Sequence, residues 1–356
     1  MSSHKLAILD DYAGIAPAYF EHIPNLKVDS YADTILPRGE ERISAQVARL
    51  ESYDIIASMR ERTPFPKELL SRLPNLKLLV TTGLRNLSID LPAARENDII
   101  VAGTTGKREI SHPQLQDLVM PALSYDATTQ QCFSLLLSLT SRIPIDNSVL
   151  RAGGPFQTGV GMTLSNKVFG CVGLGRLGTN AARTAILGFG MKVIAWSTNL
   201  TQEKADEAAE RIGLPKGSIK AVGQEELLPT SDVVSVHYLL SDRSRDLIGA
   251  KELGLMKKTA LLLNTSRGPI VNEEALLSVL KEGKIRGAGL DVFWTEPLPV
   301  ESPWRTTNWG QDGRSDVVLS PHMGYVVEET MNKWYAEQAD TVEKYVKGQE
   351  LPDIMT

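Results

Sequence analysis

The chain has 356 residues, of which 42% are hydrophobic and 23% charged, and its formal net charge is −5. This length exceeds what one hydrophobic core usually serves, so we expect two domains of ordinary globular composition. The small net charge gives no electrostatic reason to expect nucleic acid or an anionic membrane as a partner. Cys132 and Cys171 lie in apolar runs without a metal-binding spacing. We therefore expect buried free thiols and no metal site.

The N-terminal residues 1–11 are typical of a first strand and lack a signal-peptide pattern. No apolar run approaches the roughly 18–20 residues that a membrane helix needs. These features predict a cytoplasmic protein.

In the first part of the chain, short apolar runs rich in β-branched residues alternate with helical patterns. Strands are predicted at 5–9, 27–31, 54–59, 76–82 and 99–103, with helices at 40–50 and 65–73 between them. An apolar stretch at 127–141 predicts a helix of about 15 residues. The insert 106–126 before it has no assigned role.

A second series of strands is predicted at 167–173, 192–197, 232–237, 260–265, 286–292 and 317–321. Its helices are predicted at 178–187, 201–212, 225–228, 243–256 and 273–282, and a last helix at 326–347. This order predicts an α/β protein with two Rossmann-like, doubly wound parallel-sheet domains and an active site in the cleft between them. We expect a discontinuous substrate-binding domain, 1–140 plus 325–356, and a dinucleotide-binding domain, 141–324.

A glycine-rich run lies between a predicted strand and a predicted helix. Alone, the G-x-G-x-x-G pattern is weak, but its position after 167–172 is the arrangement that binds dinucleotides. The first glycine makes the turn, the second lets the backbone approach the pyrophosphate, and the third lets helix and strand pack closely. The cofactor-binding residues predicted here are Gly173, Leu174, Gly175, Arg176, Leu177 and Gly178.

The second strand of this series ends without the acid that usually binds the adenosine 2′-hydroxyl. The residues at that place are Ser197, Thr198 and Asn199. Without a carboxylate nothing repels a 2′-phosphate, and Arg176 offers positive charge. We therefore expect NADPH (NADP) in preference to NAD, the alternative being a site indifferent between the two.

Three polar groups follow three successive predicted strands in the stretches 264–271, 289–297 and 320–324. They are Arg267, Glu296 and His322. Residues beyond the carboxyl ends of parallel strands line the ligand crevice. Hydride transfer to a 2-oxo acid needs a cation for the carboxylate, a proton donor for the nascent alkoxide, and a group that tunes the donor.

With these motifs in this order behind the glycine run, the chain resembles the D-isomer-specific 2-hydroxyacid dehydrogenase family, in particular glyoxylate/hydroxypyruvate reductases. The resemblance covers nearly the whole chain, including 231–237 and 256–260. It implies an NAD(P)-dependent oxidoreductase that interconverts a small 2-oxo acid and its D-2-hydroxy acid. It also implies a homodimer.

The resemblance assigns roles to individual residues. Arg267 is the arginine that binds the substrate carboxylate, His322 the general acid and base, and Glu296 the carboxylate paired with it. Glu296 beside His322 favours the protonated imidazole, which suits proton donation. Thr265 belongs to the cofactor site, and Asp291 is expected near the nicotinamide carboxamide.

His237 begins the family's cofactor-facing loop, so we assign it to the cofactor site; the alternative is a hydrogen-bonded structural histidine at a strand end. In the first domain, the resemblance implies that backbone N–H groups of Thr82 and Gly83 hold the substrate carboxylate. Arg85 replaces a frequent aspartate and is either an ion-pair partner or a substrate ligand. Gln130 replaces a frequent acid in the interdomain helix.

The segment 303–314, with Trp304 and Trp309, lies between Glu296 and His322 in the sequence. Two interpretations of it are equally supported: a loop that covers the substrate, or an aromatic loop packed on its own domain or on a partner subunit.

The substrates implied are glyoxylate, hydroxypyruvate, or an aryl or branched pyruvate. The alternative function is a non-enzymatic dinucleotide sensor of the corepressor type, which has no obvious need for Arg267, Glu296 and His322 together. Oxidation of formate or phosphite is less supported, because we see no sign of the apolar anion pocket that we would expect it to need.

Overall fold

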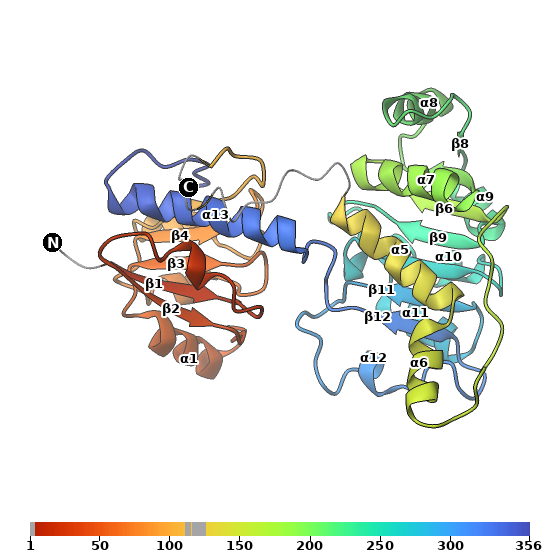
Figure 1. Ribbon diagram of the computed structural model, residues 1–356, viewed down its shortest axis with the longest axis horizontal. Coiled ribbons are helices and arrows are strands. Elements are labelled where there is room, and N and C mark those ends of the chain that lie inside the picture. Colours follow the sequence, from red (N-terminus) through yellow and green to blue (C-terminus); the bar gives the residue numbers. More distant parts are fainter. Residues whose placement is uncertain (1–3, 111–114, 116–125) are drawn as a thin grey trace. The chain divides into compact units, whose positions relative to one another are not determined.

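The computed structural model describes residues 4–110, 115 and 126–356. The chain divides into two compact units, the first formed by Met1–Leu123 with Val327–Thr356 and the second by Ser124–Val326. Each unit contains one parallel sheet with helices packed around it (Figure 1). The expected pair of α/β parallel-sheet domains is therefore confirmed. Most of the insert 106–126 lies outside the described residues.

The first unit has a five-stranded sheet in the order β2-β1-β3-β4-β5. Its strands are β1 (His4–Leu9), β2 (Leu26–Tyr31), β3 (Ile55–Ser58), β4 (Leu78–Thr81) and β5 (Ile100–Ala102). Among the described residues of this unit, the helices are the 3-10 turn η1 (Pro17–Tyr19), α1 (Glu40–Leu50), α2 (Lys67–Leu70), α3 (Leu91–Glu96) and α13 (Glu328–Val346). Every residue of β3 and β4 is buried, as expected of inner strands of a parallel sheet covered on both faces.

The second unit has a seven-stranded sheet in the order β12-β11-β10-β9-β6-β7-β8. Its strands are β6 (Val168–Val172), β7 (Lys192–Trp196), β8 (Ile219–Ala221), β9 (Val233–Val236), β10 (Leu261–Asn264), β11 (Gly287–Leu290) and β12 (Asp316–Leu319). Six were expected from the sequence. The seventh, β8, is an edge strand of three residues, too short to give a recognisable pattern.

The helices of the second unit include α5 (Ala127–Thr140), α6 (Ile143–Arg151), α7 (Arg176–Phe189), α8 (Gln202–Arg211), α9 (Gln224–Thr230), α10 (Ala250–Gly254), the 3-10 turn η2 (Gly268–Ile270), α11 (Glu273–Lys281) and α12 (Pro303–Thr306). Strand order reverses beside β6, which lies between β7 and β9. Ligands of such sheets bind beyond the carboxyl ends of the strands at this switch point.

Helix α5 belongs to the second unit. The Phe133 ring stacks on Phe169 of β6 at 5.9 Å and on Phe189 of α7 at 5.3 Å between ring centroids. The sequence placed the boundaries at 140/141 and 324/325, whereas the structure divides at 123/124 and 326/327. The difference arises because the apolar face of α5 packs on the sheet of the second unit, contacting β10, β11 and β12.

Helix α13, drawn in blue, returns to the first unit and runs alongside β4 (Figure 1). None of the helices in the described part of the chain combines the length and apolar character that crossing a bilayer requires.

Candidate active site

The glycine-rich turn joins β6 to α7. Gly173 has φ +99°, and a Cβ there would lie 2.7 Å from the His237 carbonyl oxygen. A Cβ on Gly178 would lie 2.1 Å from the Gly173 carbonyl oxygen, so the helix can approach the turn only without a side chain. A Cβ on Gly175, by contrast, would meet no atom within 4 Å. The open space beside Gly175, at the N-terminus of α7, fits a dinucleotide pyrophosphate.

The other residues of the turn differ in exposure. Leu174 packs partly against the core of the second unit, and Leu177 is half-buried. The side chain of Arg176 is 75% exposed and forms an ion pair with Asp126, the N-cap residue of α5. Arg176 thus has a carboxylate partner, so an anion at this place would have to compete with Asp126.

The end of β7 carries hydroxyl and amide groups. The Thr198 hydroxyl lies 2.7 Å from the Tyr238 hydroxyl, and the Tyr238 ring stacks on Trp196. Lys204 Nζ donates to the Asn199 carbonyl oxygen at 2.9 Å. Ser197 is half-buried. Sequence reasoning did not single out Lys204 or Tyr238, because both reach this place from other elements.

His237 follows β9, where its Nε2 lies 2.9 Å from the Ser235 hydroxyl. Burial lowers its pKa to about 4, against a smaller opposing effect of the Asp126 charge. The ring is therefore neutral near pH 7. This geometry supports the structural interpretation of its side chain, while its backbone packs against Gly173.

The segment after β10 is held by side-chain to backbone bonds. Asn264 Nδ2 donates to the Arg267 carbonyl oxygen at 3.0 Å, and Ser266 Oγ donates to the Val236 carbonyl oxygen at 3.0 Å. Arg267 Nη1 donates to the Ser266 carbonyl oxygen at 2.8 Å. The Thr265 hydroxyl is buried and finds no hydrogen-bond partner among the described residues. An unpartnered buried hydroxyl fits a site completed by a bound polar ligand.

Asp291 follows β11 and is fully buried. Its carboxylate accepts from Ser320 Oγ at 2.6 Å and from the N–H groups of Met323 and Gly324 at 2.8 and 2.9 Å. Burial raises its pKa and outweighs these bonds, which act in the opposite direction. Asp291 therefore fixes the loop that carries His322, and its expected place near the nicotinamide stays a prediction.

Gln131 of α5 reaches the same group. Its Nε2 donates to Ser320 Oγ at 2.8 Å and to Asp291 at 3.3 Å. The sequence drew attention to Gln130, which is exposed here. The hydrogen bonds from α5 to Ser320 and Asp291 thus come from Gln131 and not from Gln130.

Glu296 and His322 form a direct pair. His322 Nδ1 lies 2.6 Å from Glu296 Oε2, and Glu296 Oε1 accepts from the Phe293 N–H at 2.8 Å. Burial acts to raise the pKa of Glu296, but the hydrogen bond and charge of His322, with the Phe293 N–H and the Arg267 charge, lower it overall. The carboxylate is therefore ionised at neutral pH. These contacts bring Arg267, Glu296 and His322 into one electrostatic environment.

His322 has φ +56° and its N–H donates to the Ser320 carbonyl oxygen at 3.0 Å. Its ring packs edge-on against Tyr325, with centroids 5.6 Å apart. The ring is thus fixed on one nitrogen by Glu296, which leaves Nε2 as the nitrogen for proton transfer.

The segment 303–314 packs on its own unit. Trp304 is 1% exposed and stacks between Trp294 and Trp309, at 5.5 and 5.8 Å. Its Nε1 donates to Glu273 at 2.9 Å. Of the two interpretations of this loop, the structure favours the packed aromatic loop, which also buttresses the segment from Phe293 to Glu296.

In the first unit, Thr82 and Gly83 follow β4. The Thr82 N–H donates to the Ser58 carbonyl oxygen at 3.3 Å, and the Gly83 N–H donates to Thr104 Oγ1 at 2.9 Å. Both N–H groups thus already donate hydrogen bonds within the unit. To bind a substrate carboxylate, each would have to give up its present acceptor or donate to both acceptors. Their substrate role stays a prediction.

Arg60, which the sequence did not single out, lies directly against this loop, because a Cβ on Gly83 would be 2.1 Å from Arg60 Nη1. Asn86 Nδ2 donates to the Arg60 carbonyl oxygen at 2.7 Å. Arg85 is exposed, and no ion pair to it is found within the described part of the chain.

Among the described residues, no group of three or more histidine, cysteine, aspartate or glutamate side chains is placed to hold a metal ion. Cys132 and Cys171 are both buried and free. The His322–Glu296 contact places an imidazole and a carboxylate side by side, and the Arg267 charge acts on the same carboxylate.

Sequence comparisons show which known proteins this chain resembles. The sequence model of the D-isomer specific 2-hydroxyacid dehydrogenase NAD-binding domain matches residues 133–324. A protein named glyoxylate reductase from Thermococcus litoralis is 35% identical over 81% of this chain and 80% of its own length. A glyoxylate/hydroxypyruvate reductase B from Enterobacter sp. is 30% identical, over 79% of this chain and 78% of that protein.

Solved structures of similar proteins align with nearly the whole chain. The crystal structure of a phosphoglycerate oxidoreductase from Vibrio cholerae aligns with a TM-score of 0.80 at 28% identity, covering 97% of this chain and 99% of that one. A glyoxylate reductase from Paecilomyes thermophila aligns with a TM-score of 0.66 at 25% identity, over 100% and 99% of the two chains.

Proposed function

Because this chain belongs to the D-isomer specific 2-hydroxyacid dehydrogenase family, we propose that it reduces a small 2-oxo acid to the D-2-hydroxy acid, or catalyses the reverse. It is an oxidoreductase that uses a nicotinamide dinucleotide and acts between CH–OH and C=O. The glycine turn with its open space at Gly175 and the unpartnered Thr265 hydroxyl support a dinucleotide site in the second unit. The reduced nicotinamide supplies the hydride when bound.

The contact that carries the proposal is the 2.6 Å pair between His322 Nδ1 and Glu296 Oε2. With Nδ1 held by a carboxylate, Nε2 of the imidazolium donates its proton to the carbonyl oxygen of the oxo acid. This proton neutralises the oxygen that would become an alkoxide as C2 is reduced, so the product is the 2-hydroxy carboxylate and the imidazole is left uncharged. Glu296 stabilises the imidazolium before transfer and fixes its ring.

Arg267 binds the substrate carboxylate through its guanidinium fork, which matches a carboxylate in shape and charge. The same cation lies near the carbonyl oxygen on which negative charge develops, and so stabilises the transition state. The loop carrying Thr82 and Gly83 also contributes to binding the oxo acid. The relatives' names support glyoxylate and hydroxypyruvate as the first substrates to test.

NADPH is the preferred cofactor. Ser197, Thr198 and Asn199 present no carboxylate at the end of β7, and the Lys204 ammonium is bound to the Asn199 carbonyl oxygen. Hydroxyl donors with one nearby cation suit a 2′-phosphate and do not repel it.

The protein acts as a homodimer. No residue of α6 is buried, and Ile143 and Leu150 on it are exposed, as are Phe156 and Val160 in the loop that follows. Exposed apolar side chains gathered in one segment are typical of an interaction site, and a second copy is the occupant that the family resemblance implies. A cytoplasmic location remains a prediction, consistent with the two free thiols.

The corepressor-like alternative receives no support. Its partner would be a peptide, whereas the relatives named above are reductases. A protein that only senses the dinucleotide also has no chemical step that would require the His322–Glu296 pair together with Arg267.

The test is turnover by the purified protein of NADPH or NADH with a panel of 2-oxo acids, followed by the near-ultraviolet absorbance of the reduced nicotinamide. We expect oxidation of NADPH that depends on the oxo acid. Tight dinucleotide binding without turnover of any oxo acid would contradict the enzymatic function and favour the sensor.

A further inference from the structure

Helix α13 buries polar side chains on the face that it turns toward the strands of the first unit. Glu337, Gln338 and Thr341 are at most 1% exposed. A helix packed on a sheet normally buries an apolar face, and burying a carboxylate is costly unless it is fully hydrogen-bonded. The polar groups of these side chains therefore need hydrogen-bond partners in the first unit.

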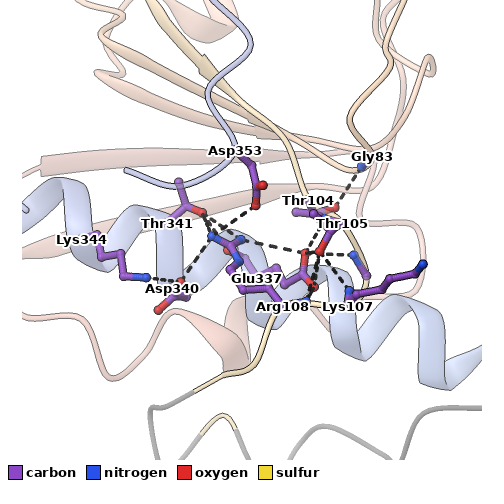
Figure 2. A network of polar contacts seen from close by, with 11 residues as sticks. Gly83, Thr104, Thr105, Lys107, Arg108, Glu337, Asp340, Thr341, Lys344 and Asp353 are labelled. Atoms are coloured by element: carbon purple, nitrogen blue, oxygen red, sulfur yellow. Dashed lines mark hydrogen bonds and ion pairs between the residues drawn. The ribbon is translucent and has the colours of Figure 1, made fainter. Parts of the chain in front are cut away.

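Glu337 binds the backbone of the segment that follows β5. Its carboxylate accepts from the N–H groups of Thr105 at 2.6 Å, Gly106 at 3.0 Å and Arg108 at 2.9 Å. Figure 2 shows this carboxylate between the helix and the loop. The Arg108 guanidinium completes the network by donating to the Glu337 carbonyl oxygen at 2.8 Å.

The network continues to the loop after β4. Thr104, next to the clamped Thr105, is 1% exposed, and its hydroxyl accepts the Gly83 N–H at 2.9 Å (Figure 2). Glu337 therefore sets the acceptor that fixes the peptide plane of Gly83, where φ is +86°.

Gln338 acts on the N–H group of the residue before Gly83, Thr82. Its Nε2 donates to the Ser58 carbonyl oxygen at 3.0 Å and to the Val80 carbonyl oxygen at 3.3 Å. The Ser58 carbonyl oxygen is also the acceptor of the Thr82 N–H. Gln338 thus binds the acceptor of the Thr82 N–H directly. Glu337 binds the residue next to the acceptor of the Gly83 N–H, although α13 lies far from this loop in the sequence.

We propose that Glu337 and Gln338 are positioning residues for binding of the 2-oxo acid, acting through Thr104 and Ser58 on the loop that begins at Thr82. The inference rests on the proposed function, since it assigns that loop to the substrate. Neither side chain touches substrate. They determine the direction of the loop's backbone, and an error of about 1 Å in a binding loop can cost up to about a hundredfold in activity.

The experiment compares Gln338→Met, which keeps the volume and removes the donor, with Thr104→Val, which removes the acceptor of the Gly83 N–H. We expect each to raise KM for glyoxylate about tenfold or more, with kcat changed less and the Kd of NADPH unchanged. Thr104→Ser keeps a hydroxyl and restores the wild-type KM. Glu337→Gln is a further variant, but it risks loss of the fold.

Gln46→Met is the matched control, because Gln46 is also 1% exposed but lies on α1. It should leave KM unchanged. Amide hydrogen exchange gives a readout that does not depend on activity: the amides of residues 81–86 should exchange faster in Gln338→Met and Thr104→Val, and not in Gln46→Met.

Folded Gln338→Met and Thr104→Val proteins with wild-type KM would overturn the proposal, as would an equal rise of KM in Gln46→Met. If the wild-type protein turned over no oxo acid, the proposed function would fail, and the exchange rates would still test the coupling. Unchanged protection of residues 81–86 in both variants would then overturn it.

Discussion

Replacing Glu296 by glutamine tests the acid–base pair with little change of shape. Glu296→Gln keeps an oxygen for the Phe293 N–H but removes the negative charge beside His322 Nδ1, 2.6 Å away. The imidazolium then loses its counter-charge, so proton donation during reduction should slow. We expect kcat for oxo-acid reduction to fall, with the Kd of NADPH unchanged.

The size of the effect follows from the contact. A hydrogen bond to a charged group contributes about 1.5–3 kcal/mol, which corresponds to a roughly 10- to 150-fold change in rate. The Glu296 side chain is 34% exposed, and solvent screening therefore places the expected loss in the lower part of this range, at about 10- to 30-fold.

The effect of Glu296→Gln on kcat should depend on pH in a defined direction. Burial acts to raise the pKa of Glu296, but the hydrogen bond and charge of His322, the Phe293 N–H and the Arg267 charge together lower it, so that the pKa of Glu296 in the folded protein lies below the ordinary 4.5. Stabilisation by the ionised pair is therefore present above pH 4.5 and is lost as the pH falls through the lowered value. The difference in kcat between wild type and Glu296→Gln should be full at neutral pH and narrow in acid.

The assay is steady-state reduction of hydroxypyruvate at several pH values, with Glu301→Gln as control, since Glu301 is exposed nearby in the chain. Glu301→Gln should match the wild type. A Glu296→Gln enzyme with wild-type kcat at neutral pH would refute the assignment of Glu296 to the proton-transfer step.

Three further predictions concern the cofactor, acid stability and assembly. Ser197→Asp should lower the ratio of kcat/KM with NADPH to that with NADH by about tenfold, equivalent to 1.4 kcal/mol of repulsion, whereas Lys192→Asp at the other end of β7 should not; equal ratios would place 2′ recognition elsewhere. His237 has a pKa lowered by burial to about 4. The free energy of unfolding, measured in urea, should therefore decrease as the pH falls from 6.5 to 4. This decrease should be larger in wild type than in His237→Asn, by at most about 3 kcal/mol. An equal decrease in the two proteins would contradict a neutral His237 ring in the folded protein. Phe156→Asp should turn a dimer into a monomer in light scattering, while Leu187→Asp should not; a monomeric wild type would refute the proposed interface.

The sequence predicted the fold of the second unit well, because its determinants are local. The strand, turn and helix around Gly173 and Gly178 depend on neighbouring residues, and the structure shows close contacts that exclude a Cβ at both positions. Glu296 and His322 follow successive strands of a parallel sheet, so strand order alone brought them to one edge.

What the sequence could not predict depends on distant parts of the chain. Helix α5 has an apolar pattern that suits either domain, and only its tertiary packing, against Phe169, Phe189 and the strands β10 to β12, assigns it to the second unit. Glu337 and Gln338 look like solvent-facing residues of a helix, yet both are buried on the ends of strands. The N–H groups of Thr82 and Gly83 find acceptors at Ser58 and Thr104, which no local pattern indicates.

In the proposed reaction His322 transfers the proton, while other residues bind the dinucleotide. The most direct measurement is single-turnover reduction of hydroxypyruvate by wild type and His322→Ala at saturating NADPH, together with the Kd of NADPH for each. We expect the rate to fall by about 10²- to 10⁴-fold in His322→Ala while the Kd of NADPH stays within about twofold. A wild-type rate in His322→Ala would contradict this role of His322.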